Sequence, residues 1–187
     1  LTALGFLAMI LAGTALLSMP FASADGTPTA LMSALFTATS ATTLTGLVIE
    51  DTGSHWSLAG QLIVLALIQA GGLGIMSITS LTGMLLTGRV KLRTRYSTAA
   101  EGRPIFEDGV RRTLVATLLL TVFFEGAVAV LLFARFTTVY GMSVPRAAWE
   151  GVFHAISAFN NAGFGLRSDS LISYNTDGWI LIPLAGA

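Results

Sequence analysis

Two stretches of this chain, 117 residues apart, share a pattern that limits what the chain can fold into. Residues 153–166 read FHAISAFNNAGFGL and residues 36–47 read FTATSATTLTGL, and in each a Ser-Ala pair is followed by a Gly six residues after the Ser. The stretch at residues 153–166 is too apolar for a surface loop and too rich in Asn and Gly for the middle of a membrane helix. The shared positions are Phe36/Phe153, Ala38/Ala155, Ser40/Ser157, Ala41/Ala158 and Gly46/Gly163. The pattern predicts a repeated unit in which a short helix ends in a glycine loop.

The composition indicates a membrane protein. The chain has 187 residues, of which 53% are hydrophobic and 11% are charged, whereas soluble domains carry about 25% charged residues. The absence of Cys excludes disulfides and Cys-based metal sites. Because the chain begins inside one apolar run and ends in another, we expect a fragment of a longer protein. No basic segment precedes residues 1–19, so we interpret this run as a truncated transmembrane helix and not as a signal peptide.

The remaining segments fall into two similar halves. In the first half, residues 1–87, the apolar run 1–19 precedes a segment too short to span a bilayer, 29–41, then the loop 42–47 and the long apolar span 57–87. In the second half, residues 113–187, a span at 113–136 precedes a short helix at 146–158, the loop 159–166 and an apolar segment beginning at Trp179. Pro28 and Pro145 are expected in the first turns of the short helices, and Trp56 and Trp179 mark where the chain re-enters a membrane interface. The predicted fold is an all-α membrane protein of repeated span, re-entrant pore half-helix, filter loop and span.

The basic residues indicate the orientation of the chain in the membrane. The segment 88–112 holds seven of the ten basic residues, so the positive-inside rule predicts a cytoplasmic linker. Both glycine loops then enter from the outer side. The seven residues are Arg89, Lys91, Arg93, Arg95, Arg103, Arg111 and Arg112.

The glycine loops carry the chemistry that a cation needs when it leaves water. Backbone carbonyls can replace the hydration shell of potassium, and Gly gives the backbone the freedom to turn its carbonyls inward. The preceding half-helices direct their partly negative C-terminal ends toward the pore. We therefore predict ion-binding filter residues in both loops, with potassium as the metal ion. They are Thr43, Leu44, Thr45, Gly46, Leu47, Asn160, Asn161, Ala162, Gly163 and Phe164.

The same residues carry a family resemblance. The segments SATTLTGL, EDTGSHWS, LIQAGGLGIM and FHAISAFNNAGFGL, in this order, resemble the Trk/Ktr/HKT superfamily of potassium transporters, most closely the bacterial Ktr and Trk membrane subunits. The resemblance implies four span–loop–span repeats, of which this chain holds the first two, with Gly46 and Gly163 as filter glycines. Gly46 implies a preference for potassium, because Ser at the first filter position goes with sodium in this family.

The resemblance also implies partners and a location. It implies a pore-forming subunit for potassium transport, multi-pass in the plasma (inner) membrane, in contact with the lipid bilayer. The full-length subunit is expected to form a homodimer on a cytoplasmic nucleotide-binding regulatory subunit. No enzymatic activity, catalytic residue, cofactor or nucleic-acid partner is expected.

Several polar and small residues inside the spans have structural interpretations. Gln69 needs a polar partner, and Glu125 is expected to be an acceptor that holds a loop or a neighbouring helix. His154 is expected to be a hydrogen-bonded packing residue, and the glycines of the AGGLG segment at 70–74 to permit close helix packing. Two other classes stay open: a neutral-solute, aquaporin-like channel with paired half-helices, and an intramembrane enzyme using Glu125 and His154. The absence of Pro from both loops and of a nucleophile motif counts against them.

Overall fold

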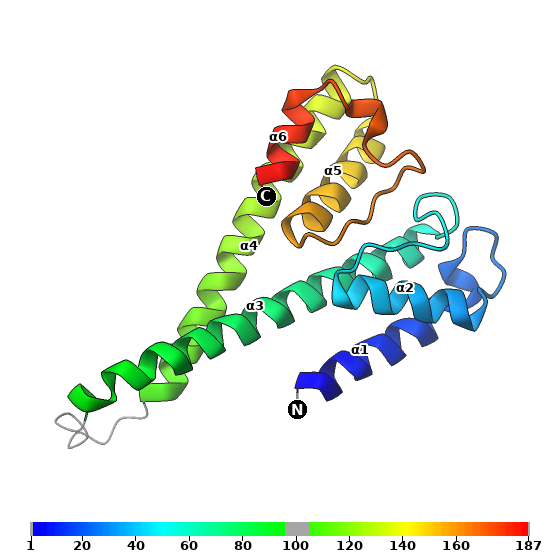
Figure 1. The fold of residues 1–187 in the computed structure, drawn as a ribbon. Coiled ribbons are helices and arrows are strands. Elements are labelled where there is room, and N and C mark those ends of the chain that lie inside the picture. The colour runs from blue at the N-terminus through cyan, green and yellow to red at the C-terminus, as the bar shows by residue number, and fades with distance from the viewer. Residues whose placement is uncertain (1, 96–104, 187) are drawn as a thin grey trace. The chain divides into compact units, whose positions relative to one another are not determined.

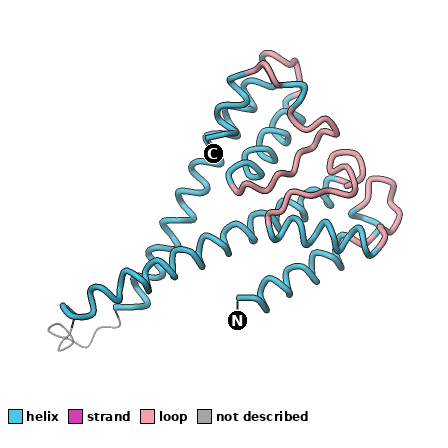
Figure 2. Tube along the Cα trace, viewed as in Figure 1, coloured by secondary structure: helices cyan, strands magenta, loops and turns pink. Residues whose placement is uncertain are grey.

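The computed structural model describes the backbone of residues 2–95 and 105–186, and side chains for residues 3–76 and 115–186. The described chain is helical and contains no β-strand. The described residues form six α-helices, which Figure 1 shows as coiled ribbons, and Figure 2 colours the loops apart from the helices. The elements are α1 (Thr2–Leu17), η1 (Pro20–Ala22), α2 (Leu31–Thr43), α3 (Leu58–Arg95), α4 (Ile105–Thr138), α5 (Val144–Phe159), η3 (Ile172–Tyr174) and α6 (Gly178–Gly186).

Two helices are long and apolar enough to cross a bilayer, within the part of the chain described. They contain the segments Leu58–Met76 in α3 and Val115–Thr138 in α4. The apolar helix α1 has 16 residues, and the short helices α2 and α5 have 13 and 16, fewer than the roughly 20 that span 30 Å of hydrocarbon. The helical content and these two spans agree with the expected all-α membrane class.

The chain divides into two compact units. One holds residues 1–72 with 123–187, and the other holds residues 73–122. The second unit contains the continuation of α3 and the beginning of α4, so both helices extend into the basic segment 88–112. Residues 96–104 of that segment lie outside the described residues. All contacts reported below belong to the first unit.

The helix boundaries follow local chemistry. Pro145 lies in the first turn of α5, as expected. Pro28 does not begin α2, which starts three residues later at Leu31, because Ala30 is still extended with a ψ of 134°. The helix α3 follows Ser57, whose hydroxyl accepts a hydrogen bond from the Gly60 amide at 3.2 Å.

Backbone pairing joins the segment after α1 to the segment before α3. Ser23 and Trp56 form an isolated antiparallel bridge, beside a hydrogen bond from the Ala24 amide to the His55 carbonyl at 2.8 Å. The side chain of Trp56 is only 1% exposed, and its ring contacts His55 edge-on at 4.7 Å. Trp56 is therefore a core residue and not an exposed interface anchor, whereas Trp179 is 71% exposed.

The core joins the two predicted repeats. One cluster of buried apolar residues contains Leu17, Ala38 and Ile68 from the first half together with Phe153 and Phe164 from the second. The helix α1 packs along α2 (Figure 1), and α5 packs on α6. A second cluster, which includes Leu132, Phe136 and Ile180, lies wholly within the second half. The two halves therefore share one core around the ends of α2 and α5.

We expect Gly60→Ala to destabilise the protein. A Cβ at Gly60 would lie 2.2 Å from the Ala22 carbonyl oxygen, so the backbone of α3 or of η1 would have to move, at a cost of about 1–3 kcal/mol. The measurement is the thermal midpoint of the purified full-length protein in detergent. Gly5→Ala is the matched control, because a Cβ there meets nothing within 4 Å. An equal midpoint for both variants would contradict the packing described.

Candidate functional site

The end of α2 is closed by two backbone hydrogen bonds and a left-handed residue. The Leu44 amide donates to the Ala41 carbonyl at 3.4 Å, and the Thr45 amide donates to the Ser40 carbonyl at 2.9 Å. Leu44 has a φ of +57°, as the residue following a helix does in a Schellman motif. A Leu in this conformation is strained by roughly 1–2 kcal/mol, so the surrounding contacts hold it there.

The end of α5 repeats this arrangement at positions 117 residues later. The Asn161 amide donates to the Ala158 carbonyl at 2.9 Å, and the Ala162 amide donates to the Ser157 carbonyl at 2.8 Å. Asn161 has a φ of +52°. Asn tolerates the left-handed region better than Leu does, so the same turn is formed with less strain in the second loop.

Both glycines of the aligned pair adopt positive φ angles. Gly46 has a φ of +76° and Gly163 a φ of +72°. Each loop therefore has two left-handed residues separated by one other residue, Leu44 and Gly46 in one, Asn161 and Gly163 in the other. In a regular strand successive carbonyls point to opposite sides, and a positive φ at every second residue breaks that alternation.

The two loops meet at these glycines. A Cβ on Gly46 would lie 2.8 Å from the Ala162 carbonyl oxygen and 3.1 Å from the Gly163 Cα, and a Cβ on Gly163 would lie 3.0 Å from the Gly46 Cα. The left-handed backbone and the contact each exclude a side chain. The sequence pattern paired these glycines by repeat but did not predict that they touch.

The remaining predicted site residues surround this contact. The Thr43 and Thr45 hydroxyls are 2.7 Å apart, and the Thr43 hydroxyl also donates to the Thr39 carbonyl at 2.8 Å. Asn160, Ala162 and Phe164 are buried. The members with exposed surface are Thr43, Thr45, Leu47, Asn161 and Gly163, and Leu44 and Gly46 are half-buried.

A buried hydroxyl braces the second loop. Ser157 Oγ donates a hydrogen bond of 2.6 Å to the Phe164 carbonyl across the loop. The hydroxyl of Ser40, its counterpart in the first loop, is buried without a hydrogen-bond partner among the described residues. The two loops therefore have the same backbone conformation, but only the second is held by a hydrogen bond from its serine hydroxyl. The aligned serines were the signal in the sequence that could have revealed this brace.

Three polar side chains meet directly beneath the second loop. Glu125 Oε2 accepts from Gln69 Nε2 at 3.2 Å, and Glu125 Oε1 accepts from Asn160 Nδ2 at 3.2 Å. Asn160 Nδ2 also donates to Gln69 Oε1 at 3.1 Å. The need of Gln69 for a partner and the interpretation of Glu125 as a structural acceptor are both confirmed.

Two adjacent glycines let α3 pass close to both helix ends. A Cβ on Gly71 would lie 2.1 Å from the Thr42 carbonyl oxygen, and a Cβ on Gly72 would lie 1.8 Å from Asn160 Oδ1. The expectation that they permit close packing is confirmed. One helix thereby supports both loops.

His154 packs behind the second loop. Its Nδ1 lies 2.8 Å from the Glu150 carbonyl oxygen, and the residue is 5% exposed, which confirms the interpretation as a hydrogen-bonded packing residue. His154 lines a cavity of about 440 Å³ together with Asn161, Gly163 and Leu181. Glu125 and His154 share no hydrogen-bond partner in the described chain, and the described residues hold no cluster of three or more metal-ligating side chains.

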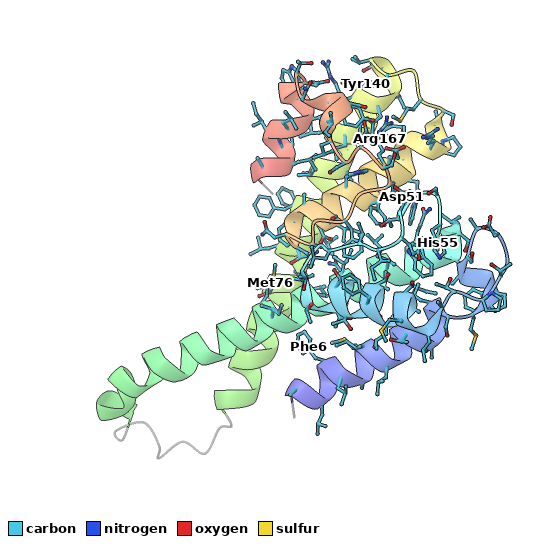
Figure 3. All side chains as sticks on the ribbon, turned by 45° about the vertical axis from the view of Figure 1, so that its right-hand side comes forward. Phe6, Asp51, His55, Met76, Tyr140 and Arg167 are labelled. Carbon is cyan, nitrogen blue, oxygen red and sulfur yellow. The ribbon has the colours of Figure 1, made fainter. Side chains whose placement is uncertain are left out.

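The segments that follow the two loops carry half-buried charged residues. Figure 3 labels Asp51 and His55 on the first and Arg167 on the second, with Tyr140 after α4. In the first, Glu50 accepts from the Ser33 hydroxyl at 3.2 Å. In the second, Arg167 Nε donates to Asp169 at 3.1 Å, and its guanidinium lies over the Tyr174 ring. These ionic contacts had no signal in the sequence beyond the polarity of the segments.

Asp177 anchors the segment before α6 to the end of α4. Its Oδ2 accepts from Arg135 Nε at 2.8 Å and from the Tyr140 hydroxyl at 3.1 Å, and its Oδ1 accepts from the Trp179 amide at 3.0 Å. The Arg135 hydrogen bond is the main cause that lowers the pKa of the Asp177 carboxyl below its ordinary value. The ionised carboxylate thus fixes the position of α6.

The described residues form an all-helical fold with two helices of membrane-spanning length and two glycine loops that meet at helix ends. These features are those of a helical membrane protein. Residues 6–186 match the TrkH family, described as cation transport proteins. The chain belongs to this family.

Three curated relatives give the same family picture. The chain is 38% identical over 175 residues to the Ktr system potassium uptake protein B of Bacillus subtilis, covering 94% of this chain and 38% of the relative. It is 37% identical over 186 residues to the potassium/sodium uptake protein NtpJ of Enterococcus hirae, covering 99% and 41%. It is 35% identical over 188 residues to the Ktr system potassium uptake protein B of Vibrio alginolyticus, covering 98% and 39%. The chain spans about two fifths of the length of these relatives.

We expect Ser157→Ala and Ser40→Ala to differ in their effects on stability. The first leaves the buried Phe164 carbonyl without its donor and costs about 1–3 kcal/mol, whereas the second removes a hydroxyl that has no described partner and costs little. The measurement is the thermal midpoint of both variants of the full-length protein in detergent. A larger loss for Ser40→Ala than for Ser157→Ala would contradict the assigned bracing.

We expect the Asp177 anchor to fail in acid. Because the folded-state pKa of Asp177 is lowered, its contribution is present above the unfolded pKa, about 3.9, and is lost as the pH falls through the lower folded value. Asp177→Asn should be less stable at neutral pH and should lose less stability below about pH 4. Tyr140→Phe removes one donor and keeps Arg135, so its stability at neutral pH should lie between those of the wild type and Asp177→Asn. Thermal midpoints between pH 3 and pH 7 measure this, and parallel profiles for wild type and Asp177→Asn would refute it.

Proposed function

We propose that this chain supplies two walls of a cation filter in the membrane subunit of a Trk/Ktr-type potassium uptake system. The observation that carries the proposal is the matched pair of loops. Two helix ends with the same hydrogen bonds and the same left-handed positions bring Gly46 and Gly163 into contact. Membership of a family of cation transport proteins supports the same function.

The loop backbone suits a cation that has lost its water. A positive φ at every second residue allows neighbouring carbonyls to turn to one side, which is the arrangement that replaces a hydration shell. The helices α2 and α5 end at these loops, so their partly negative C-terminal ends favour a cation there. The proposed filter residues are 43–47 and 160–164, with their backbone carbonyls as cation ligands except that of Phe164, which accepts from Ser157 Oγ.

The contact between the two glycines implies that further walls are required. Because Gly46 and Gly163 touch, the two loops are neighbours and leave no space for an ion between these two residues. The relatives are more than twice as long as this chain, which leaves room for two further repeats. We propose a filter of four loops, of which these are the first two.

Potassium is the proposed substrate, with sodium as the competing ion. Two of the relatives are named as potassium uptake proteins and one as a potassium/sodium uptake protein. Gly46 at the first filter position favours potassium in this family. The proposed location is the plasma membrane, with the loops facing outward and the linker 88–112 in the cytoplasm.

The proposed assembly follows from the same relatives. The names of two of them refer to a Ktr system, which supports a complex of several components. We propose a homodimer of the full-length subunit, in contact with a cytoplasmic nucleotide-binding regulatory subunit.

We expect Gly163→Ala to lower potassium uptake by about tenfold or more while Gly165→Ala preserves it. A Cβ at Gly163 meets the Gly46 Cα at 3.0 Å on a left-handed backbone, whereas a Cβ at Gly165 meets only His154 Nε2 at 3.5 Å, an ordinary contact. Strain of about 1–3 kcal/mol at the filter corresponds to a loss of about tenfold or more in flux. The assay is growth of potassium-uptake-deficient cells at low potassium, with rubidium flux in proteoliposomes.

The amount of each variant in the membrane must be measured beside its flux. Normal potassium flux in Gly163→Ala would contradict the assignment of this loop to the filter. Water flux without cation flux in the wild type would favour the neutral-solute channel instead.

A further inference from the structure

The cluster of Gln69, Glu125 and Asn160, here called the filter clamp, connects three elements at one point. Gln69 lies on α3, Glu125 on α4, and Asn160 directly after α5. Both carboxyl oxygens of Glu125 and both polar atoms of the Gln69 amide take part in hydrogen bonds of 3.1–3.2 Å. Glu125 is 7% exposed and Asn160 is 4% exposed, and Glu125 lies within the apolar span Val115–Thr138.

The orientation of every group in the filter clamp follows from one backbone carbonyl. Asn160 Nδ2 donates to the Ile156 carbonyl at 2.9 Å, so the amide nitrogen and not its oxygen faces the cluster. The Gln69 atom opposite this nitrogen must then be the acceptor Oε1, which turns Gln69 Nε2 toward Glu125. Both oxygens of Glu125 consequently face donors.

A side chain with two acceptors and no donor is required at position 125. Gln at this position would place an amide N–H toward either Gln69 Nε2 or Asn160 Nδ2, both of which are donors. A carboxylate satisfies both donors at once. The hydrogen-bond pattern therefore calls for a carboxyl group at position 125, inside an apolar span, where acidic residues generally have a functional role.

The filter clamp is specific to the second loop. In the first loop, Thr43 occupies the position equivalent to Asn160, and its hydroxyl donates to the Thr39 carbonyl just as Asn160 donates to Ile156. Thr43 contacts Thr45 within its own loop, whereas Asn160 reaches a carboxylate on another helix. The shared contact caps the helix, and the additional contacts hold the second loop alone.

We propose that Glu125 is a positioning residue that sets the ion preference of the second filter loop through Asn160. Asn160 is followed by Asn161 and, two residues later, by Gly163, which have the positive φ angles of the loop. The Asn160 Oδ1 atom lies against Gly72. Releasing Asn160 frees the residue at which the loop leaves α5. This inference rests on the proposed function of the loop as a filter wall.

Exchanging the side chains of Gln69 and Glu125 tests whether the hydrogen-bond pattern matters or only the presence of an acid at position 125. Glu125→Gln alone sets two donors against each other, and Gln69→Glu alone sets two carboxylates against each other. With both changes together, the Asn160 N–H that is not given to Ile156 is shared between the carboxylate introduced on α3 and the amide oxygen introduced on α4, and the introduced amide N–H donates to the second carboxylate oxygen. The pattern is then complete again, with its one charge moved to α3.

The test uses the full-length protein with the four combinations at positions 69 and 125. Each is reconstituted in proteoliposomes, and rubidium uptake is measured against increasing potassium and sodium. We expect each single variant to lose potassium-over-sodium preference by about tenfold or more, the effect of losing a charge-assisted hydrogen bond. The swapped variant should recover most of that preference. Gly126→Ala is the matched control on α4, because a Cβ there meets nothing within 4 Å.

The outcomes distinguish this inference from the proposed function. Native preference in Glu125→Gln, or no recovery in the swapped variant while it is present in the membrane at wild-type amount, would overturn the role of Glu125. If the single variants fail to accumulate, accumulation and native preference of the swapped variant support the inference, and its absence from the membrane overturns it. A wild type without potassium flux, or a fully active Gly163→Ala, would instead refute the filter itself.

Discussion

The structure depends on the hydrogen bonds that two non-helical loops can make inside an otherwise apolar fold. Backbone amides and carbonyls that leave a helix without water must find partners within the protein. Here both helix ends use the same two backbone bonds, from Leu44 and Thr45 in one and from Asn161 and Ala162 in the other. Each solution requires a left-handed residue directly after the turn begins. The conformation that makes the carbonyls available is thus the conformation that ends the helix.

The helix α3 makes this arrangement possible because it lacks side chains where space is needed. Gly71 and Gly72 lie against Thr42 and Asn160, so the backbone of one helix supports both loops. Gln69, one turn earlier, adds the polar contact that the glycines cannot provide. Helices in membranes associate through small residues, which let their backbones pack closely, and through polar residues, which form hydrogen bonds between them. In this chain both act on loops and not only on other helices.

The sequence was sufficient for the helical class, the approximate position of each helix and the family. These follow from apolar length, from the positions of Pro and Gly, and from motifs that persist over nearly the whole chain. Local patterns also predicted that Gln69 needed a partner and that Glu125 was an acceptor.

The sequence could not predict which groups meet across the fold. Gln69 and Asn160 are 91 residues apart and Gln61 and Trp149 are 88 apart, and no local period encodes such pairs. The burial of Trp56 was also missed, because an aromatic residue before a span looks the same whether it faces lipid or the core. The assignment of residues 43–47 and 160–164 to a filter remains a prediction.

The filter clamp also has a consequence for how the protein is made. Chains are synthesised from the N-terminus, so Glu125 enters the membrane before Asn160, which follows 35 residues later. Gln69 precedes Glu125 by 56 residues and is already in place. An acid that enters an apolar phase without a partner is costly, and the earlier span offers one before the second loop exists. Gln69 is therefore the partner of Glu125 that comes first in the chain, and the first half of the molecule supplies part of the site that the second half completes.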